Sequence, residues 1–415
     1  MLVTVKKSSL NGMVEIPSSK SVAHRMIIAS VLSGSRSSII GNLKSKDIVA
    51  TLDCMEGLGA TIIKNEKGAI IDATTLESNS KIFNVNESGS TMRFLLPMLP
   101  VYLNNFKMVG EGRIGERPVS ALRKAMAESG VSVDNDYLPV NVSGKYNSNS
   151  FTVDAGVSSQ FVTGLLFTLV ALGGGKLKID GELTSKGYVD ITIQVLEKYG
   201  VAVEFKDNEY SVSLQNGINA PKEIKVSGDW SSACFWIVAG VLAGDITISG
   251  LEYPDAQPDS IILSVIKAMG GNVSYEQGLV RAKKSALKAI EFDADGSPDI
   301  VPILAVACAC TEGVSTITGT RRLRLKESDR VKAVTEMLSA CGVKVESGEN
   351  HIKIWGTKDI QGGVIDSARD HRIAMSGMIF GTMAQGITTI KDVECVSKSY
   401  PDFIKDFEKL GGIYE

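Results

Sequence analysis

Residues 16–34, IPSSKSVAHRMIIASVLSG, place a short polar and cationic opening in front of an almost wholly apolar helix. A polar opening followed by an apolar helix recurs five more times along the chain. A helix that is apolar nearly all round must be covered by other elements, so the pattern predicts six buried helices, one in each of six repeats. The six openings are anchored on Ser19, Ser88, Ser158, Ser231, Ser297 and Asp370, at intervals of 66 to 73 residues.

A glycine marks the end of a second, amphipathic helix in every repeat. Glycine accepts the left-handed backbone conformation that follows a helix C-terminus, and alternating stretches such as VSVDNDYLPVNVSG after it are typical of a strand hairpin. Each repeat therefore has the predicted order strand, buried helix, strand, amphipathic helix and hairpin, or βαβαββ. The glycines are Gly59, Gly130, Gly200, Gly270, Gly342 and Gly411, at intervals of 69 to 72 residues.

Six repeats of this length favour two domains, because three buried helices can cover one another in a shared core. We expect an α/β fold of two domains, each built from three βαβαββ repeats as an inside-out α/β barrel, with the buried helices directed at the interdomain cleft. The first domain is predicted to comprise residues 1–18 and 227–415, made discontinuous by the return of the chain. Residues 19–226 form the second.

Composition excludes several classes of function. The chain has 415 residues, 44% of them hydrophobic, and a formal net charge of -3. This balance provides no general attraction to nucleic acid or to a membrane surface, so anion binding must come from local clusters of Lys and Arg. The N-terminal stretch MLVTVKKSSLNGMVEI does not resemble a signal peptide, and no window is apolar enough to span a bilayer, so we expect a cytoplasmic location.

Metal and cofactor chemistry are not expected either. The three histidines are scattered, and Cys308-x-Cys310 is not a metal-binding spacing. The cysteines are predicted to be buried thiols, since free cysteine is among the most buried residue types. They are Cys54, Cys234, Cys308, Cys310, Cys341 and Cys395.

The polar openings are the candidate functional residues. Helix N-termini present unpaired backbone N–H groups and the positive end of the helix dipole, so openings that converge on one cleft form an anion site. Ser and Asp at these positions are equally explained as N-caps, whereas a cation there opposes the dipole and needs an anion. The openings contain Lys20, Ser21, Arg25, Gly89, Ser90, Thr91, Arg93, Ser158, Ser159, Gln160, Asp229, Ser231, Ser232, Asp299, Asp370, His371 and Arg372.

Two loops add further charge. The stretch GEGRIGERP, residues 110–118, contributes Arg113 and Arg117. The stretch TRRLRLKESDR, residues 320–330, holds two carboxylates among five cations where the fifth repeat passes into the sixth. A solvated basic face would explain one such run, but its place in the repeat favours a site.

Several motifs carry a family resemblance. SKSVAHR, ESGSTMR, GEGRIGERP, SSQF, SKGYVDIT, PDIVPILA, RLKESDR, DHRIAM and SKSYPDF occur in this order along nearly the whole chain. They resemble the successive motifs of the 5-enolpyruvylshikimate-3-phosphate synthase family, whose two-domain fold agrees with the repeat. The resemblance implies transfer of the enolpyruvyl group of phosphoenolpyruvate to the 5-hydroxyl of shikimate 3-phosphate, with release of phosphate through a tetrahedral intermediate. It also implies a place in aromatic amino acid biosynthesis.

The resemblance further implies roles for individual residues. Asp299 would act on the hydroxyl, Glu327 would protonate carbon, and Lys20 would lie close to both the hydroxyl and the phosphate. Shikimate 3-phosphate would be bound by Lys20, Ser21, Arg25, Ser158, Ser159, Gln160, Ser185, Tyr188, Asp299 and Lys326. Phosphoenolpyruvate would be bound by Lys20, Gly89, Arg113, Gln160, Arg330, Arg372 and Lys398, with Gly89 leaving room for a close approach by substrate.

Two alternatives share the architecture. One is the UDP-N-acetylglucosamine enolpyruvyl transferase family, although Gly112 stands here where that family has its reactive cysteine. The other is a non-catalytic binder of sugar phosphates or RNA ends, which would not need Asp299 and Glu327 together. The main interpretation predicts small-molecule substrates, no nucleic-acid or membrane partner, and a monomer.

Some residues depart from the family pattern or fall outside it. The chain reads Glu-Ser-Gly-Ser at residues 87–90, where the family often has Asn-Ala-Gly-Thr, and Arg322 stands where an Asn is common. His24 and His351 are expected to be structural or solvent-facing. His371 is expected to orient its neighbours in the sixth opening.

Overall fold

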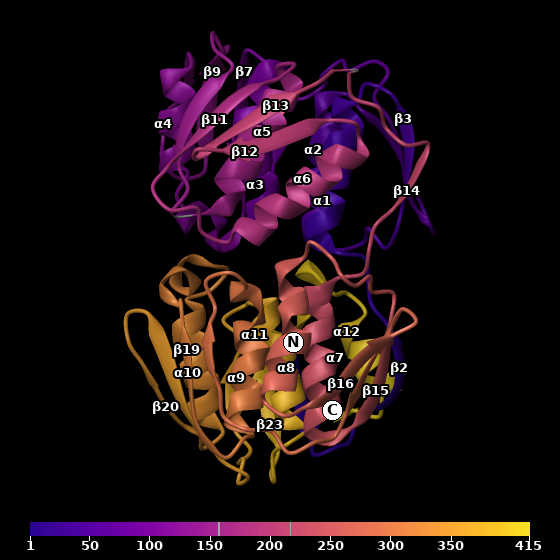
Figure 1. Cartoon of the computed structure of the whole chain (residues 1–415), viewed down its shortest axis with the longest axis vertical. Coiled ribbons are helices and arrows are strands. Elements are labelled where there is room, and N and C mark those ends of the chain that lie inside the picture. The colour runs from indigo at the N-terminus through magenta and orange to yellow at the C-terminus, as the bar shows by residue number, and fades with distance from the viewer. Residues whose placement is uncertain (157, 216) are drawn as a thin grey trace. The chain divides into compact units, whose positions relative to one another are not determined.

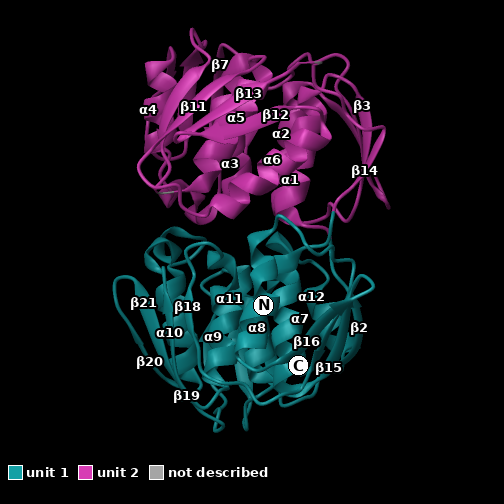
Figure 2. Ribbon diagram, in the orientation of Figure 1, with its two compact units in different colours: residues 1–17, 227–415 teal, residues 18–226 magenta. Residues whose placement is uncertain are grey.

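The computed structural model describes residues 1–156, 158–215 and 217–415, which divide into two compact units (Figure 2). Unit 1 comprises residues 1–17 and 227–415, and unit 2 comprises residues 18–226. Ser18, which we expected in the first domain, belongs to unit 2. The reason is local, because the Ser18 hydroxyl accepts the backbone N–H of Asn42 at 2.8 Å.

Six buried helices form where the polar openings predict them. Side chains of Ser19, Ser88, Ser158, Asp229 and Asp370 accept N–H groups from the first turns of five of them. Asp229 rather than Ser231 caps the fourth helix, because the helix begins at Trp230, one residue before its predicted anchor. The helices are α1 (Lys20–Leu32), α3 (Gly89–Met98), α5 (Ser159–Ala171), α7 (Trp230–Ala243), α9 (Val301–Ala309) and α11 (His371–Gly381).

The second helix of each repeat ends before its predicted glycine. All six glycines have positive φ, from 80° at Gly200 to 113° at Gly59, the conformation that side chains rarely adopt. These helices are α2 (Lys46–Leu58), α4 (Ser120–Glu128), α6 (Lys186–Lys198), α8 (Ile262–Ala268), α10 (Arg330–Ala340) and α12 (Phe403–Lys409). Short 3-10 turns are η1 (Leu99–Val101), η2 (Gly112–Glu116), η3 (Pro258–Ile261), η4 (Pro298–Ile300), η5 (Arg321–Leu325) and η6 (Val393–Lys398).

Within the described residues, the strands form six four-stranded sheets, three in each unit. In unit 2 their orders are β14 (Glu223–Lys225), β3 (Arg36–Ile40), β5 (Gly68–Asp72), β4 (Thr61–Asn65); β6 (Ile82–Asn84), β7 (Asn105–Val109), β9 (Val140–Gly144), β8 (Val131–Val133); and β10 (Ser150–Asp154), β11 (Gly175–Asp180), β13 (Glu209–Ser213), β12 (Ala202–Lys206). In unit 1 they are β16 (Asn272–Glu276), β17 (Leu279–Lys283), β15 (Asp245–Ser249), β2 (Asn11–Glu15); β18 (Glu291–Asp293), β19 (Gly313–Thr318), β21 (His351–Gly356), β20 (Lys344–Ser347); and β22 (Val364–Asp366), β23 (Thr388–Lys391), β1 (Leu2–Lys6), β24 (Ile413–Tyr414).

The sheets share one βαβαββ topology. The first two strands of a repeat pair in parallel, and its hairpin pairs antiparallel with the second strand, as in β6, β7 and β9. Three sheets take a strand from a distant part of the chain. β14 completes the sheet of the first repeat, with Ile224 opposite Ile39, while β1 and β2 complete two sheets of unit 1. The long-range pairings close each unit on itself.

The almost wholly buried first helices of the repeats lie in the interior of each unit, whereas α4 lies at an outer edge (Figure 1). In unit 1, the Trp236 ring stacks on Phe403 with centroids 4.8 Å apart, and in unit 2 Phe94 meets Phe167 at 5.9 Å. Burying one such side chain contributes about 1.5–3 kcal/mol, so the inner helices are held chiefly by apolar packing. This packing confirms the predicted two-domain α/β class and places the polar helix starts at the ends of each core.

The cysteines are free thiols, and burial raises the pKa of Cys54 to about 12 and that of Cys308 to about 11. Cys310 is only partly buried, contrary to the prediction, since it lies at the end of α9. In the described part of the chain, no three or more His, Cys, Asp or Glu side chains are grouped to hold a metal ion. No helix among the described residues is both long and apolar enough to cross a membrane.

Candidate functional site

Arg330, the first residue of α10, is the centre of a charged cluster in unit 1. Its side chain is 1% exposed, and its guanidinium donates to three carboxylates. Nε donates to Asp370 at 2.8 Å, Nη1 to Asp299 at 2.7 Å and Nη2 to Glu327 at 2.7 Å. Burial alone would lower the pKa of Arg330, but Asp370, Glu327 and Asp299 raise it well above its usual value. The guanidinium is therefore permanently charged and holds three carboxylates in fixed positions.

Asp299 receives two further cations. Arg372, at the start of α11, donates from Nη2 to Asp299 Oδ2 at 3.0 Å, and Lys326 Nζ lies 3.5 Å from Oδ1. Burial would raise the pKa of Asp299, but Arg372, Lys326 and Arg330 together hold it well below its usual range. Asp299 is thus an anion at neutral pH, and the starts of α9, α10 and α11 meet around it.

Asp259, in η3, belongs to the same region and was missed by the sequence analysis. It is 2% exposed, and its Oδ2 accepts the Ser231 hydroxyl at 2.6 Å. Burial, and then repulsion by Asp299, raises the pKa of Asp259 to about 6, against the attraction of Arg372. No motif marks this residue, because only the fold brings η3 beside the starts of α7 and α11.

The raised pKa of Asp259 predicts a pH-dependent stability. A carboxyl whose folded-state pKa lies above its unfolded value contributes stability that is complete below the unfolded pKa, 3.8, and is lost as pH rises through about 6. Asp259→Asn keeps a neutral side chain at every pH. We expect its free energy of unfolding, relative to the parent chain, to improve by on the order of 2 kcal/mol between pH 4 and pH 8.

Urea unfolding of both chains at several pH values measures this difference. Asp229 and Asp299 repel the Asp259 carboxylate and Arg372 attracts it, so the midpoint reports the balance of these neighbours. A difference that stays constant from pH 4 to pH 8 would show that Asp259 does not titrate in the folded protein.

In unit 2, Lys20 at the start of α1 has a protein partner that the sequence analysis did not find. Its Nζ lies 2.8 Å from Oδ2 of Asp47, in the first turn of α2, and both side chains are largely buried, at 14% and 12% exposure. Asp47 supplies an anion for this cation. The unfavourable interaction of the Lys20 charge with the dipole of α1 is therefore offset by Asp47 within unit 2.

Arg25 is 2% exposed and turned into the unit. Its Nε donates to Thr192 at 2.7 Å, Nη1 to the Ser21 carbonyl at 2.7 Å, and Nη2 to the Tyr188 carbonyl at 2.8 Å. Burial lowers the pKa of Arg25 to about 9, which leaves the guanidinium charged at neutral pH. Arg25 thus joins α1 to α6, and it brings predicted site residues of both helices together.

The starts of α3 and α5 also meet. Arg93 Nη1 donates to Gln160 Oε1 at 2.8 Å, and Gln160 Nε2 donates to Ser90 Oγ at 3.0 Å. Ser158 caps α5 by accepting the Gln160 N–H, and Ser159 begins the helix. Predicted residues of two repeats are therefore adjacent in unit 2, in an arrangement that leaves polar groups at one end of the helices.

The loop after β7 places Arg117 beside Gly89. The space beside Gly89 holds the Arg117 guanidinium, whose Nη1 would lie 2.6 Å from an added Cβ, so the close approach is made by Arg117. Arg117 is 8% exposed. Arg113, the predicted ligand, instead has a half-exposed side chain and pairs with Glu116 at 2.9 Å.

The remaining predicted residues fall in both units. Ser185 precedes α6 in the left-handed conformation, with φ of 50°, and is buried. Lys398 in η6 is 9% exposed and donates to the Arg369 carbonyl at 3.0 Å. Unit 1 thus holds Asp299, Lys326, Glu327, Arg330, Arg372 and Lys398, and unit 2 holds Lys20, Ser21, Arg25, Gly89, Arg113, Ser158, Ser159, Gln160, Ser185 and Tyr188.

The three histidines and Arg322 differ in their burial and in their contacts. His24 is buried against Thr51, with its Nδ1 2.7 Å from Thr51 Oγ1, and burial together with Lys20 and Arg25 holds its pKa well below the usual value. His371 is 1% exposed behind Asp370, and His351 is exposed. Arg322 donates to Asp295 at 2.7 Å.

The fold is that of the enolpyruvyl transferases. A solved EPSP synthase from Acinetobacter baumannii superposes with a TM-score of 0.84 at 25% identity, covering 100% of this chain and 99% of that one. The enolpyruvyl transferase NikO from Streptomyces tendae superposes with a TM-score of 0.80 at 18% identity, covering 100% and 98%. The second likeness concerns the fold alone.

The family follows from the sequence comparisons. Residues 5–407 match the family model described as EPSP synthase (3-phosphoshikimate 1-carboxyvinyltransferase). A 3-phosphoshikimate 1-carboxyvinyltransferase of Clostridium novyi is 39% identical, covering 100% of this chain and 98% of the relative, and one of Clostridium acetobutylicum is 38% identical, covering 99% and 97%. The chain belongs to the EPSP synthase family, which confirms the predicted resemblance.

Proposed function

We propose that the chain performs its family's reaction with the residues assigned above. The enzyme transfers the enolpyruvyl group of phosphoenolpyruvate to the 5-hydroxyl of shikimate 3-phosphate and releases phosphate. The observation that carries this function is family membership over nearly the full length, with Asp299, Glu327 and Lys20 all present at motif positions. We further propose that it acts in the cytoplasm as a monomer on these two small substrates.

The proposed site combines the polar ends of both units. Each substrate carries one phosphate and one carboxylate, and Arg suits these anions because its planar fork binds them bidentately. Ser158, Ser159 and Ser185 bind the shikimate phosphate, with Lys326 nearby and Arg25 behind them. Ser21, Gln160, Tyr188 and Asp299 line the shikimate ring. Lys20, Gly89, Arg113, Gln160, Arg330, Arg372 and Lys398 bind phosphoenolpyruvate.

The inward direction of Arg25 supports a positioning role in this site. Its contacts reach the backbone of Ser21 and Tyr188, both assigned to the shikimate ring. Arg117 is a further cation of this region, beside Gly89, and Arg113 must leave Glu116 to bind phosphoenolpyruvate.

Formation of the tetrahedral intermediate needs two proton transfers, and its breakdown needs two more. Asp299 takes the proton of the 5-hydroxyl as the hydroxyl oxygen attacks C2 of phosphoenolpyruvate. Glu327, which must carry a proton at this stage, delivers it to the methylene carbon. The product of this addition is a tetrahedral intermediate. Elimination then breaks the C–O bond to phosphate, which leaves with the proton held by Asp299, while Glu327 takes back a methyl proton and the double bond is restored. Two carboxylates in different surroundings can divide these roles.

Substrate binding would strengthen Asp299 as a base. Without substrate, Arg330, Arg372 and Lys326 all compensate its charge and hold its pKa low. The phosphate and carboxylate of bound substrates compete for the same cations. Their arrival therefore raises the pKa of Asp299 and makes the carboxylate a better proton acceptor when the hydroxyl is present.

We also propose that the two units close on substrate. Each unit presents cations at its helix starts, and the phosphate and carboxylate of a bound substrate can attract cations of both units at once. We expect small-angle X-ray scattering to show a smaller radius of gyration after addition of shikimate 3-phosphate, and no such change with shikimate, which lacks the phosphate. An unchanged radius at saturating shikimate 3-phosphate would contradict closure.

Phosphate release by the purified chain tests the function directly. Release that requires both phosphoenolpyruvate and shikimate 3-phosphate supports the proposal. Release with UDP-N-acetylglucosamine in place of shikimate 3-phosphate would support the other enolpyruvyl transferase instead. Binding of shikimate 3-phosphate without release would support a non-catalytic binder.

A further inference from the structure

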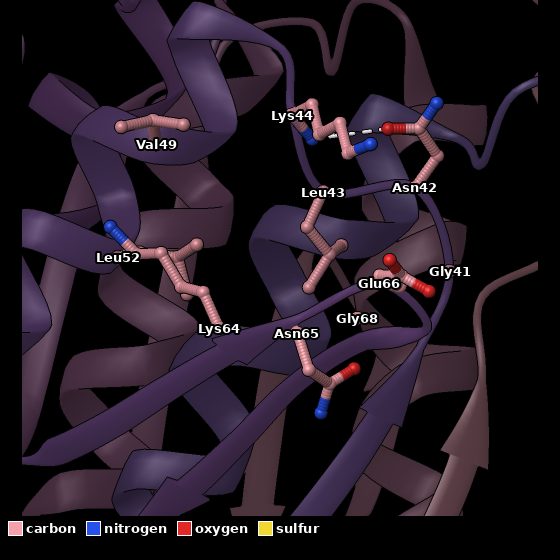
Figure 3. Close-up of a pocket in the computed structure, with 10 residues that line it drawn as sticks. All are labelled: Gly41, Asn42, Leu43, Lys44, Val49, Leu52, Lys64, Asn65, Glu66 and Gly68. Atoms are coloured by element: carbon pink, nitrogen blue, oxygen red, sulfur yellow. Dashed lines mark hydrogen bonds between the residues drawn. The ribbon is translucent and has the colours of Figure 1, made fainter.

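A cavity of about 650 Å³ opens in unit 2 between the start of α2 and the hairpin of β4 and β5 (Figure 3). We call it the α2 pocket. Its volume falls within the range of about 300–1,000 Å³ that is usual for small-molecule sites. No residue assigned to the two substrates lines it, so the proposed reaction does not explain it.

The lining of the α2 pocket is apolar in its interior and charged at its edge. Leu43 and Leu52 are 7% and 1% exposed, and Val49 on α2 lies beside them. Lys44 and Glu66 are exposed, and neither forms an ion pair with another described residue. Lys64, also at the edge, is already compensated by Asp53 at 3.0 Å.

These charges favour one class of ligand. A single available cation and a single available anion over an apolar surface match a molecule with a carboxylate, an ammonium group and an apolar body. A ligand with only a carboxylate would meet repulsion from Glu66, and one with only an amine would meet repulsion from Lys44. The volume suits a molecule between an amino acid and a dipeptide in size.

Three contacts connect the region of the α2 pocket with other parts of unit 2. The Asn42 N–H donates to Ser18 Oγ, and a Cβ added to Gly41 would lie 3.2 Å from Val226 Cβ, so the pocket wall touches the first and last residues of the unit. Asp47, three residues after Lys44, holds Lys20 at 2.8 Å. A ligand that displaces residues 42–44 therefore acts on the segment that positions Lys20.

We propose that the α2 pocket binds a small zwitterion with an apolar body, and that its occupancy alters the position of Lys20 through Asp47. Binding is independent of the proposed function. The effect on catalysis rests on that function, so the two are measured separately.

Isothermal titration of the full chain with the dipeptide leucyl-leucine tests the binding. We expect N-acetyl-leucyl-leucine and leucyl-leucinamide, each with one charge removed, to bind at least fivefold more weakly. Lys44→Gln should weaken the affinity for the dipeptide at least fivefold and remove the difference in affinity between the dipeptide and leucyl-leucinamide. Glu66→Gln should remove the difference in affinity between the dipeptide and N-acetyl-leucyl-leucine.

Lys46→Gln is the matched control, because Lys46 is exposed two residues from Lys44, at the start of α2, but does not line the pocket. Its dipeptide affinity should equal that of the parent chain, and thermal melting checks that every variant is folded. Absence of binding at millimolar dipeptide, or equal binding by the parent chain and Lys44→Gln, would overturn the site.

The effect on Lys20 is tested by turnover. Saturating dipeptide should change KM for phosphoenolpyruvate at least twofold in the parent chain but not in Val49→Trp, whose indole fills the pocket. Binding without any change in KM would overturn the connection to Lys20. A chain that binds the dipeptide yet releases no phosphate would contradict the proposed function and leave the binding site supported.

Discussion

Replacement of Glu327 by Gln is expected to lower kcat by about 10²–10⁴-fold, while KM for both substrates stays within about twofold. Gln keeps the shape of the side chain and an oxygen that can accept from Arg330, which lies 2.7 Å away. It cannot deliver a proton to the methylene carbon of phosphoenolpyruvate. The loss should therefore fall on the chemical step, and steady-state phosphate release with both substrates varied measures it.

Glu336→Gln, on α10, is the control. Glu336 is 61% exposed and lies 3.8 Å from Lys332, so its loss should leave kcat and stability unchanged. Exchange of solvent deuterium into the methylene group provides a second measurement, since this exchange requires the proton transfer assigned to Glu327. Near-normal turnover of Glu327→Gln would remove this residue from the mechanism.

Replacement of Arg330 by Met is expected to destabilise the protein by about 3–5 kcal/mol and to abolish turnover. Met occupies a similar volume but leaves three carboxylates without their shared partner. Asp370 is the most costly of them, because it is 0% exposed and its pKa is held down by Arg330 against the effect of burial. Urea unfolding at neutral pH measures the loss.

Two further variants separate a charge effect from a packing effect. Arg321→Met removes an exposed cation paired with Glu349, and we expect a change below about 1 kcal/mol. Arg330→Met combined with Asp370→Asn should recover part of the lost stability, because the second change removes the uncompensated buried charge. A single Arg330→Met variant as stable as the parent chain would contradict this account of the cluster.

The repeat made the architecture predictable. A polar cap before an apolar helix, and a glycine after an amphipathic one, are local signals that need only neighbouring residues to act. Because both signals recur six times at nearly constant spacing, they also indicated the βαβαββ repeats and their number. The strand exchanges of β14, β1 and β2 carry no such local signal, because each partner lies in a distant part of the chain.

The candidate site was predicted in its residues but not in its contacts. Motif positions named Lys20 and Gly89, whereas the partners that define their surroundings, Asp47 and Arg117, are 27 and 28 residues away. Asp259 was missed because an Asp after Pro is common in turns and carries no mark of burial. The roles of Glu327 in catalysis and of Arg330 in stability and turnover are predictions that the proposed variants test.

The sequence by itself determined the α/β class, the repeat and the family, because periodic hydrophobicity and motif order are properties of the chain alone. Only the tertiary structure decided which charges compensate one another. Arg330 among three carboxylates, Arg25 turned inward and Asp259 with its raised pKa all depend on burial and on distances between separate elements. The energy of a charge is governed by its partners and its exposure to water, and neither is specified until the helices have packed.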